Sequence, residues 1–407
     1  MSSYIIDLAK PEFWVTFLAA VILLAPMANG QFRSLRFALI NLGFLTALLG
    51  FTGGGVILAG CVVAWLLTVA IKNKQLRPVF STVALLLCIA LFLLHKIHGI
   101  GEAIRLQGAA PILSLIAFSY VCLRLIDMYR SLWEERLPFP SLIQTINYCL
   151  PFHMMAAGPI QSYEEFITQP DLPRPVESRQ VLRGFERLAF GVFKKFVLAF
   201  VIQKIFLTDF TAGNGYWALE AQMFFIWLYI DFSAYSDIAV GIGRIIGVQT
   251  PENFNRPYLA RNITVFWERW HISLSMWIRR NLFYPTQIAA LRVTGNRWPM
   301  WCASVAFMVS FLLCGLWHGI AWNFVVWGVM HASGLIIVNL YKKRLSKKLK
   351  AKGVKKYMAN PYIKVVAMAI TFEWVAISHL TFFFRTPEMM QGFYWLVNLV
   401  TGGGSGQ

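Results

Sequence analysis

Residues 311–331 read FLLCGLWHGIAWNFVVWGVMH and place two histidines, His318 and His331, among aliphatic and aromatic side chains. They lie within residues 298–341, which contain no aspartate, glutamate, lysine or arginine. A single membrane span requires about 20 apolar residues, so this run is too long for one helix. Because glycine weakens a helix, we predict that the chain folds back near Gly315 and Gly319.

The composition of the whole chain is that of a membrane protein. Of its 407 residues, 57% are hydrophobic and 14% are charged, whereas soluble domains carry about 25% charged residues. Apolar periodic segments predict ten to twelve transmembrane or re-entrant helices. They centre near residues 20, 43, 62, 87, 116, 150, 198, 228, 310, 332, 373 and 396. The predicted fold is therefore an all-α polytopic membrane protein.

One domain accounts for this organisation, because the sequence shows no long internal repeat and its polar connections are too short for a separate soluble domain. We predict a single integral membrane domain over residues 1–401, beginning with a retained membrane segment at residues 14–28. Residues 153–163, HMMAAGPIQSY, contain Gly158 and Pro159 after an apolar run and predict a re-entrant segment. Residues 402–407, GGGSGQ, are typical of a flexible tail or an added sequence.

The net charge of +18 is concentrated in short segments between apolar stretches, which argues against nucleic acid as a partner. Residues 342–356, KKRLSKKLKAKGVKK, contain nine lysines or arginines and no acid. By the positive-inside rule, we predict that this segment and residues 72–77 lie in the cytoplasm.

The cysteines indicate neither a metal site nor a disulfide framework. The sequence contains no CxxC, no HExxH and no paired spacing of cysteine and histidine. We therefore expect no bound metal. The six cysteines, mostly within apolar segments, are Cys61, Cys88, Cys122, Cys149, Cys302 and Cys314.

Two acids lie in an otherwise apolar stretch, residues 229–248, which reads YIDFSAYSDIAVGIGRIIGV. An acid at membrane depth is costly unless it is paired, so Asp231 and Asp237 are expected to face the interior of the helix bundle. One interpretation is structural, with the acids bonded to helix ends or to Arg256 or Arg261. A direct role in catalysis is the alternative.

Residues 251–280 are rich in both tryptophan and charge. On a helix, two sets of side chains would lie on shared faces, Trp267, His271 and Ser275 on one and Trp270, Ser273 and Trp277 on the other. An amphipathic helix at the membrane interface is the simpler interpretation. His331 is interpreted as a hydrogen-bonded structural residue. For His318 a functional role stays open, because the adjacent glycine lets a substrate approach the ring.

Two of these segments together resemble the paired signature of the membrane-bound O-acyltransferase family. They are NFNRPYLARNITVFWERWHISLSMWIRR at residues 253–280 and GLWHGIAWNFVVWGVMHA at residues 315–332. The resemblance extends over residues 100–390 and is greatest to the bacterial branch that acylates alginate and teichoic acid. The supporting stretches are residues 113–130, 151–166, 191–199, 231–247 and 382–387.

This resemblance implies roles for individual residues. The family's essential histidine falls on His318, and a second position, asparagine or histidine in the family, falls on His271. Both are implied to face a central tunnel, with His318 as the general base for an attacking hydroxyl. Residues implied to line or support the tunnel are Trp267, Trp270, Ser273, Trp317, Asp231, Asp237, Asn255 and Arg256.

The resemblance also implies substrates and a location. A short acyl group, acetyl or D-alanyl, is expected to pass from a cytoplasmic thioester to a hydroxyl of a cell-envelope polysaccharide. The donor is acyl-CoA or a thioester on a phosphopantetheine carrier protein, with no bound cofactor. Membrane lipid and a periplasmic or extracellular acyltransferase are the other expected partners, and the chain is expected to span the bacterial cytoplasmic membrane several times.

Two other classes of function remain open on the sequence. A proton-coupled transporter or flippase would use Asp231, Asp237 and the histidines as a proton relay, although no inverted repeat is visible. A non-catalytic scaffold for a polysaccharide-export complex is also compatible with the aromatic content.

Overall fold

The structure is a computed structural model that describes residues 15, 18–20, 32–96, 116–169, 174, 176–207 and 217–381. Helices and loops make up these residues, with no strand among them, so the predicted all-α class is confirmed. Most of the segment predicted at residues 14–28 lies outside the described residues. The helix predicted near residue 396, the stretch at residues 382–387 and the tail at residues 402–407 also lie outside them.

The chain divides into two compact units, each made of two stretches of sequence. Unit 1 consists of Met1–Phe193 and Ser233–Asn253, and unit 2 of Lys194–Phe232 and Phe254–Gln407. Helix α11, Trp217–Ile246, contributes its first part to unit 2 and its second part to unit 1. This division does not test the single domain predicted over residues 1–401, which stays a prediction.

Five helices in the described part of the chain are long and apolar enough to cross a membrane. They are α2 (Arg33–Ile71), α11 over its Leu219–Ile246 part, α15 (Pro299–His318), α16 (Trp322–Ala359) and α17 (Pro361–Leu380). Helix α2 contains both helices predicted near residues 43 and 62. They meet at Gly50, whose φ of 75° is accessible to glycine at little cost.

Unit 1 contains a buried segment without regular structure where a helix was predicted near residue 150. Its helices are α2, α3 (Arg77–Lys96), α6 (Ile116–Trp133), α7 (Leu142–Cys149), the 3-10 turn Phe152–Met154, α8 (Tyr163–Ile167), α9 (Ser178–Phe193) and the second part of α11. Helix α7 ends just before Pro151, which lacks a backbone N–H and favours a break.

Arg124 replaces the missing helical partners of this segment. Its guanidinium is fully buried and donates to the carbonyls of Cys149, Met154 and Pro159 over 3.2, 3.4 and 3.1 Å. Irregular backbone within a membrane protein requires such internal partners. Residues 153–163 are largely buried and, after the 3-10 turn, non-helical up to Ser162; their re-entrant character stays a prediction.

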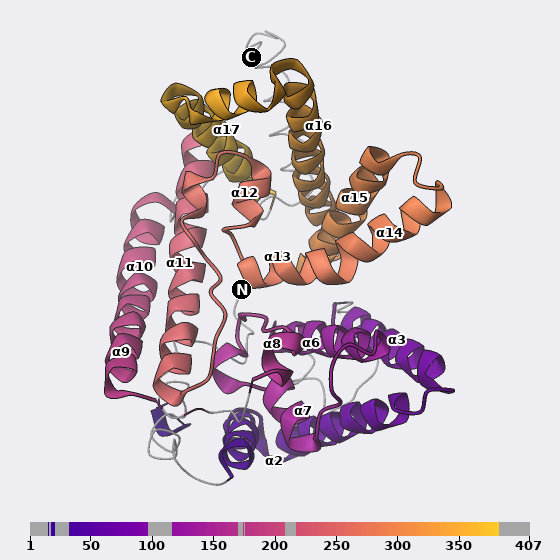
Figure 1. The fold of residues 1–407 in the computed structure, drawn as a ribbon. Helices are drawn as coiled ribbons and strands as arrows, with labels where there is room; N and C mark the ends of the chain where they lie inside the picture. The colour runs from indigo at the N-terminus through magenta and orange to yellow at the C-terminus, as the bar shows by residue number, and fades with distance from the viewer. Residues whose placement is uncertain are drawn as a thin grey trace, which may run out of the picture. The chain divides into compact units, whose positions relative to one another are not determined.

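Unit 2 contains the predicted fold-back. Helix α15 ends at His318 and α16 begins at Trp322, so the prediction of a reversal near Gly319 is confirmed. The other elements of the unit are the π-helical turns Lys194–Leu198, Gln203–Leu207 and Arg279–Phe283, the 3-10 turn Pro257–Leu259, and helices α10 (Ala199–Ile202), α12 (Ile263–Trp267), α13 (Ile272–Ile278), α14 (Tyr284–Val293) and α17. Figure 1 shows α14, α15 and α16 following one another, each beside the next.

Glycines let α15 and α16 approach closely. A Cβ on Gly315 would lie 2.2 Å from the carbonyl oxygen of Phe324, and a Cβ on Gly328 would lie 2.5 Å from that of Phe311. These separations are far inside van der Waals contact, and the atoms met belong to the backbone. The two glycines therefore fix the spacing of the helix pair that carries His318.

Gly315→Ala is expected to destabilise the protein by about 1–3 kcal/mol, because the added methyl group must push the two backbones apart. Gly55→Ala in α2 is the matched control, since a Cβ there has nothing within 4 Å. Thermal unfolding of both purified variants in detergent measures the difference. Equal melting temperatures for the two variants would contradict the close packing of α15 against α16.

Candidate active site

His318 occupies the last position of α15, where the chain leaves the helix through an extended Gly319. The imidazole is half-buried between aromatic rings. Its centroid lies 4.7 Å from that of Trp317 and 5.1 Å from that of Trp327, both edge-on, and 6.2 Å from the stacked ring of Phe324. The ring is therefore confined by aromatic neighbours without being sealed in the core.

Gly319 keeps this arrangement open. A Cβ at Gly319 would lie 2.3 Å from the ring of Phe324, the same ring that stacks on His318. A side chain here would displace the stacking partner of the imidazole. This steric conflict explains why the residue that follows His318 is a glycine.

His331 is fully buried and bonded on both ring nitrogens, as its structural interpretation predicted. Trp267 donates its indole N–H to Nδ1 over 3.2 Å, and Nε2 lies 2.9 Å from Oγ of Ser378. Since Ser378 donates its own hydroxyl proton to the carbonyl of Val375 at 2.7 Å, its oxygen accepts from His331. The bonds thus assign the neutral Nε2–H tautomer to His331.

The hydrogen bond to His331 holds Trp267 next to Trp327, which in turn contacts His318. The indole of Trp267 lies 5.9 Å from that of Trp327, and Trp327, which is 2% exposed, contacts both His318 and His331. His331 thus positions an aromatic wall behind His318. The structural interpretation of His331 agrees with these contacts.

His271 interrupts the helix on which the shared faces of Trp267 to Trp277 were predicted. Helix α12 ends at Trp267 and α13 begins at Ile272, with His271 in the left-handed conformation at φ 41° and ψ 55°. The predicted shared face of Trp267, His271 and Ser275 is therefore wrong. No glycine or proline marks this break, so tertiary packing of the buried tryptophans on either side overrides the helical pattern. A buried left-handed residue other than glycine is uncommon and is found preferentially at functional sites.

A continuous aromatic cluster within unit 2 connects the two histidines. His271 packs edge-on against Phe232 at 4.8 Å, and Phe232 contacts Phe254, which contacts Trp270. The remaining contacts run from Trp270 through Phe266 to Trp267 and then Trp327. His271 and His318 therefore border the same aromatic cluster.

The membrane-depth acids have other partners than those predicted. Asp231 pairs with Lys195 at 2.5 Å in unit 2, and Asp237 pairs with Arg187 at 2.5 Å in unit 1. The prediction of Arg256 or Arg261 as their partner is wrong. Lys195 lies in the mainly apolar stretch that follows α9, so a cation there was a sequence signal for its pair, whereas Arg187 lies on the amphipathic helix α9 and carried no such signal.

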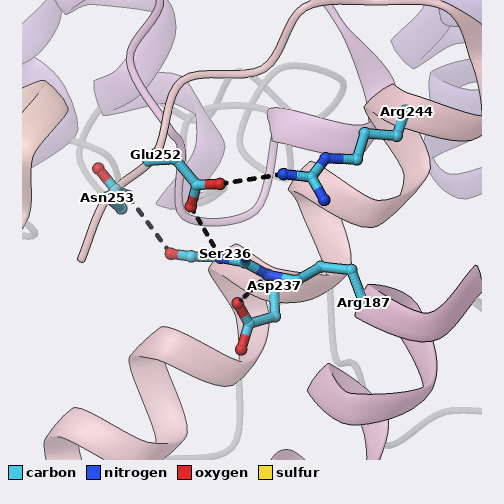
Figure 2. A network of polar contacts seen from close by, with 6 residues as sticks. All are labelled: Arg187, Ser236, Asp237, Arg244, Glu252 and Asn253. Atoms are coloured by element: carbon cyan, nitrogen blue, oxygen red, sulfur yellow. Dashed lines mark hydrogen bonds and ion pairs between the residues drawn. The ribbon is translucent and has the colours of Figure 1, made fainter. Parts of the chain in front are cut away.

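Figure 2 shows the surroundings of Asp237. Arg187 also bonds Glu252 at 2.7 Å, and Glu252 reaches Arg244 at 3.4 Å, while Asn253 donates to Oγ of Ser236 at 3.4 Å. These contacts join α9, α11 and the loop that follows α11. The pairing of Asp237 with Arg187 in this network favours the structural interpretation of this acid.

The remaining predicted site residues divide by exposure. Trp267, Trp270 and Ser273 are buried, and Trp317 is half-buried. Asn255 and Arg256 are exposed in the loop before α12, where the backbone N–H of Asn255 donates to the carbonyl of Arg269 at 2.9 Å. The tryptophans therefore lie among aromatic rings, and Asn255 and Arg256 are exposed to solvent.

Burial lowers the pKa of His271 to about 3, and this residue lies outside the five candidate spans. The imidazole is therefore neutral at pH 7. In this form the ring can donate or accept a hydrogen bond and carries no positive charge.

Because His271 is buried in its neutral form, we predict that the folded protein loses stability as the pH is lowered. The unfolded residue, with a pKa near 6.5, takes up a proton below that pH, whereas the folded residue does so only near pH 3. Its contribution is complete above about pH 6.5 and is lost as the pH falls toward 3. Between pH 7 and pH 5 this amounts to about 2 kcal/mol. Unfolding measured at both pH values should show a smaller loss for His271→Asn, and an identical loss in both proteins would contradict a neutral buried ring.

Comparison with known proteins identifies the family. The model of the membrane-bound O-acyltransferase family matches residues 66–378, which include His271 and His318. The chain belongs to this family. It is accordingly a membrane-bound O-acyltransferase, as the resemblance of its two signature segments implied.

Relatives of the chain are named for acyl transfer to teichoic acid, alginate and peptidoglycan. It is 27% identical to a teichoic acid D-alanyltransferase of Streptococcus thermophilus, over 89% of this chain and 91% of that protein. It is 34% identical to a probable alginate O-acetylase of Azotobacter vinelandii, over 52% of this chain and 41% of that protein. A peptidoglycan O-acetyltransferase of Helicobacter pylori is 30% identical over 62% of this chain and 46% of that protein.

Proposed function

We propose that this acyltransferase moves a short acyl group, acetyl or D-alanyl, from a cytoplasmic thioester to a hydroxyl of a cell-envelope polysaccharide. The observation that carries the proposal is the half-buried imidazole of His318, confined by aromatic rings at the junction of α15 and α16. The positive-inside rule puts the basic residues 342–356 on the cytoplasmic face of the bacterial inner membrane.

In the proposed reaction His318 is the general base. Its imidazole takes the proton of the acceptor hydroxyl as the oxygen attacks the thioester carbonyl, the C–O bond forms and the C–S bond breaks. The proton then passes to the departing thiolate, which leaves as a thiol. His271, neutral at pH 7, donates a hydrogen bond to the donor carbonyl or to its developing oxyanion.

The aromatic cluster protects the donor in this proposal. Trp267, Trp317 and Trp327 surround the positions next to His318 and His331. Exclusion of water beside an activated acyl group suppresses its hydrolysis. Asp231 and Asp237, which are paired with cations, take no part in the proton transfer.

D-Alanyl transfer to teichoic acid from a carrier protein is favoured by one observation. The match to the Streptococcus thermophilus D-alanyltransferase covers about nine-tenths of both chains, whereas the two O-acetylases are matched over less than half of their length. A carrier protein with a phosphopantetheine arm would then be the donor. Its acidic surface would be attracted to the basic residues 342–356.

Reconstitution into liposomes tests the proposed function. Purified protein is supplied on one face with radiolabelled acetyl-CoA or D-alanyl carrier protein, and on the other with teichoic acid or a neutral polysaccharide. The expected product is an alkali-labile ester on the acceptor. Transport of intact solute without ester formation would support a transporter instead, but the ion pairs of Asp231 and Asp237 speak against a proton relay.

A further inference from the structure

Unit 2 contains a cavity of about 850 Å³, lined mainly by α16 and α17. Its walls are mainly apolar and include Ile337, Val338, Ile370 and Trp374. The volume is in the upper part of the range of about 300–1,000 Å³ that is typical of ligand sites. Ile337 and Ile370 are themselves 57% and 65% exposed, so the walls reach the outer surface of two membrane-spanning helices.

A bend in α16 shapes the mouth of the cavity. Lys350 has φ 50° and ψ 178°, outside the helical region, and the chain turns back at this residue. The hydroxyls of Tyr341 and Tyr357 lie 2.7 Å apart as a result. A straight helix would separate residues sixteen positions apart by about 24 Å. Both tyrosines line the cavity, so the bend brings the polar end of its wall together.

Three cations line the cavity. Arg261, Lys342 and Lys364 line it from three different segments, and none of the described lining residues is acidic. Arg261 and Lys342 are exposed, and Lys364 is half-buried. The site therefore combines an apolar chamber with a cationic rim.

Lys342, on the wall of the cavity, is distant from His318 along α16. Trp322, at the start of α16 and four positions after His318, precedes Lys342 by twenty residues, which corresponds to about 30 Å of helix. That length is also the thickness of the hydrocarbon core. The cationic rim therefore lies one membrane thickness along α16 from the fold-back that carries His318.

We propose that this cavity binds one anionic phospholipid of the cytoplasmic leaflet. The phosphate contacts Arg261, Lys342 and Lys364, and an acyl chain lies along the apolar wall toward Trp374. A free phosphate would leave the apolar walls exposed, and a lipid without net charge would not match three cations with no acid among them. The basic rim lies on the face that the positive-inside rule assigns to the cytoplasm, where anionic lipids attract each lysine or arginine.

Native mass spectrometry of the purified full-length chain in detergent tests the site. The probes are dioleoylphosphatidylglycerol and dioleoylphosphatidylcholine. We expect one tightly retained phosphatidylglycerol, and at least about tenfold weaker binding of that lipid to the variant R261Q/K342Q/K364Q. Ala367→Trp, which fills the cavity from its wall without changing the charge, is expected to exclude the lipid as well.

A second triple variant separates this site from general attraction to a basic surface. K343Q/K347Q/K348Q removes the same number of charges, all from α16, at positions that do not line the cavity. It should retain phosphatidylglycerol as the unmodified protein does, and thermal unfolding checks that every variant is folded. The proposal is overturned if both triple variants lose the lipid equally, or if Ala367→Trp retains it. It is also overturned if acyl-CoA displaces phosphatidylglycerol in the unmodified protein, because the cavity would then be a donor site.

Discussion

His318→Ala is expected to lower the rate of acyl transfer by about 10²- to 10⁴-fold, the range that general base catalysis typically supplies. The ring lies at the end of α15 and is half-buried, so its removal takes away few core contacts. We therefore expect the variant to unfold at nearly the same temperature as the unmodified protein. The measurement is the single-turnover rate of ester formation in liposomes, with donor and acceptor saturating.

Chemical rescue distinguishes a base from a residue that only shapes the site. The space left by His318→Ala is bordered by Trp317 and Trp327, and imidazole added to the buffer should enter it and restore part of the rate. His318→Gln is the matched control, because its amide fills that space and cannot accept the proton. Full activity of purified His318→Ala, or equal rescue of both variants, would remove His318 from the role of base.

The fold-back and the position of His318 follow from local sequence properties. Residues 298–341 are too long for one span, and Gly319 directly follows the histidine, so both the reversal and its approximate place were predictable. The close approach of α15 and α16 could not be predicted. It depends on two contacts between the helices, of Gly315 with Phe324 and of Gly328 with Phe311. Sequence spacing gives periodicity within one helix and no distance between two.

The break at His271 and the partners of the two acids were also not predictable from sequence spacing, because both depend on contacts between distant segments. Trp267, His271 and Ser275 have helical spacing, yet the chain leaves the helix after Trp267, and His271 is left-handed next to the buried Trp270. Asp237 finds Arg187 fifty positions away, in a different helix. That an acid in an apolar segment must be paired was predictable, but the choice among the available cations is made by the tertiary fold.

His271→Ala is expected to lower acyl transfer by about 10²- to 10³-fold, the loss typical of removing one donor to a developing oxyanion. His271→Asn should stay within about tenfold of the unmodified protein. Burial keeps the pKa of His271 near 3, so the side chain acts as a neutral donor, and an asparagine amide supplies the same kind of bond. Asparagine also tolerates the left-handed backbone at φ 41° better than most residues do.

His271→Gly separates the side chain from the backbone in this experiment. Glycine adopts the left-handed conformation without strain, so the variant relieves the backbone while removing the donor. If His271 acts through its hydrogen bond, the glycine variant is as slow as the alanine variant and asparagine alone preserves the rate. If glycine preserves the rate, the residue matters only because it turns the chain between α12 and α13. If asparagine is as slow as alanine, the neutral-donor role is wrong and the imidazole itself takes part in proton transfer.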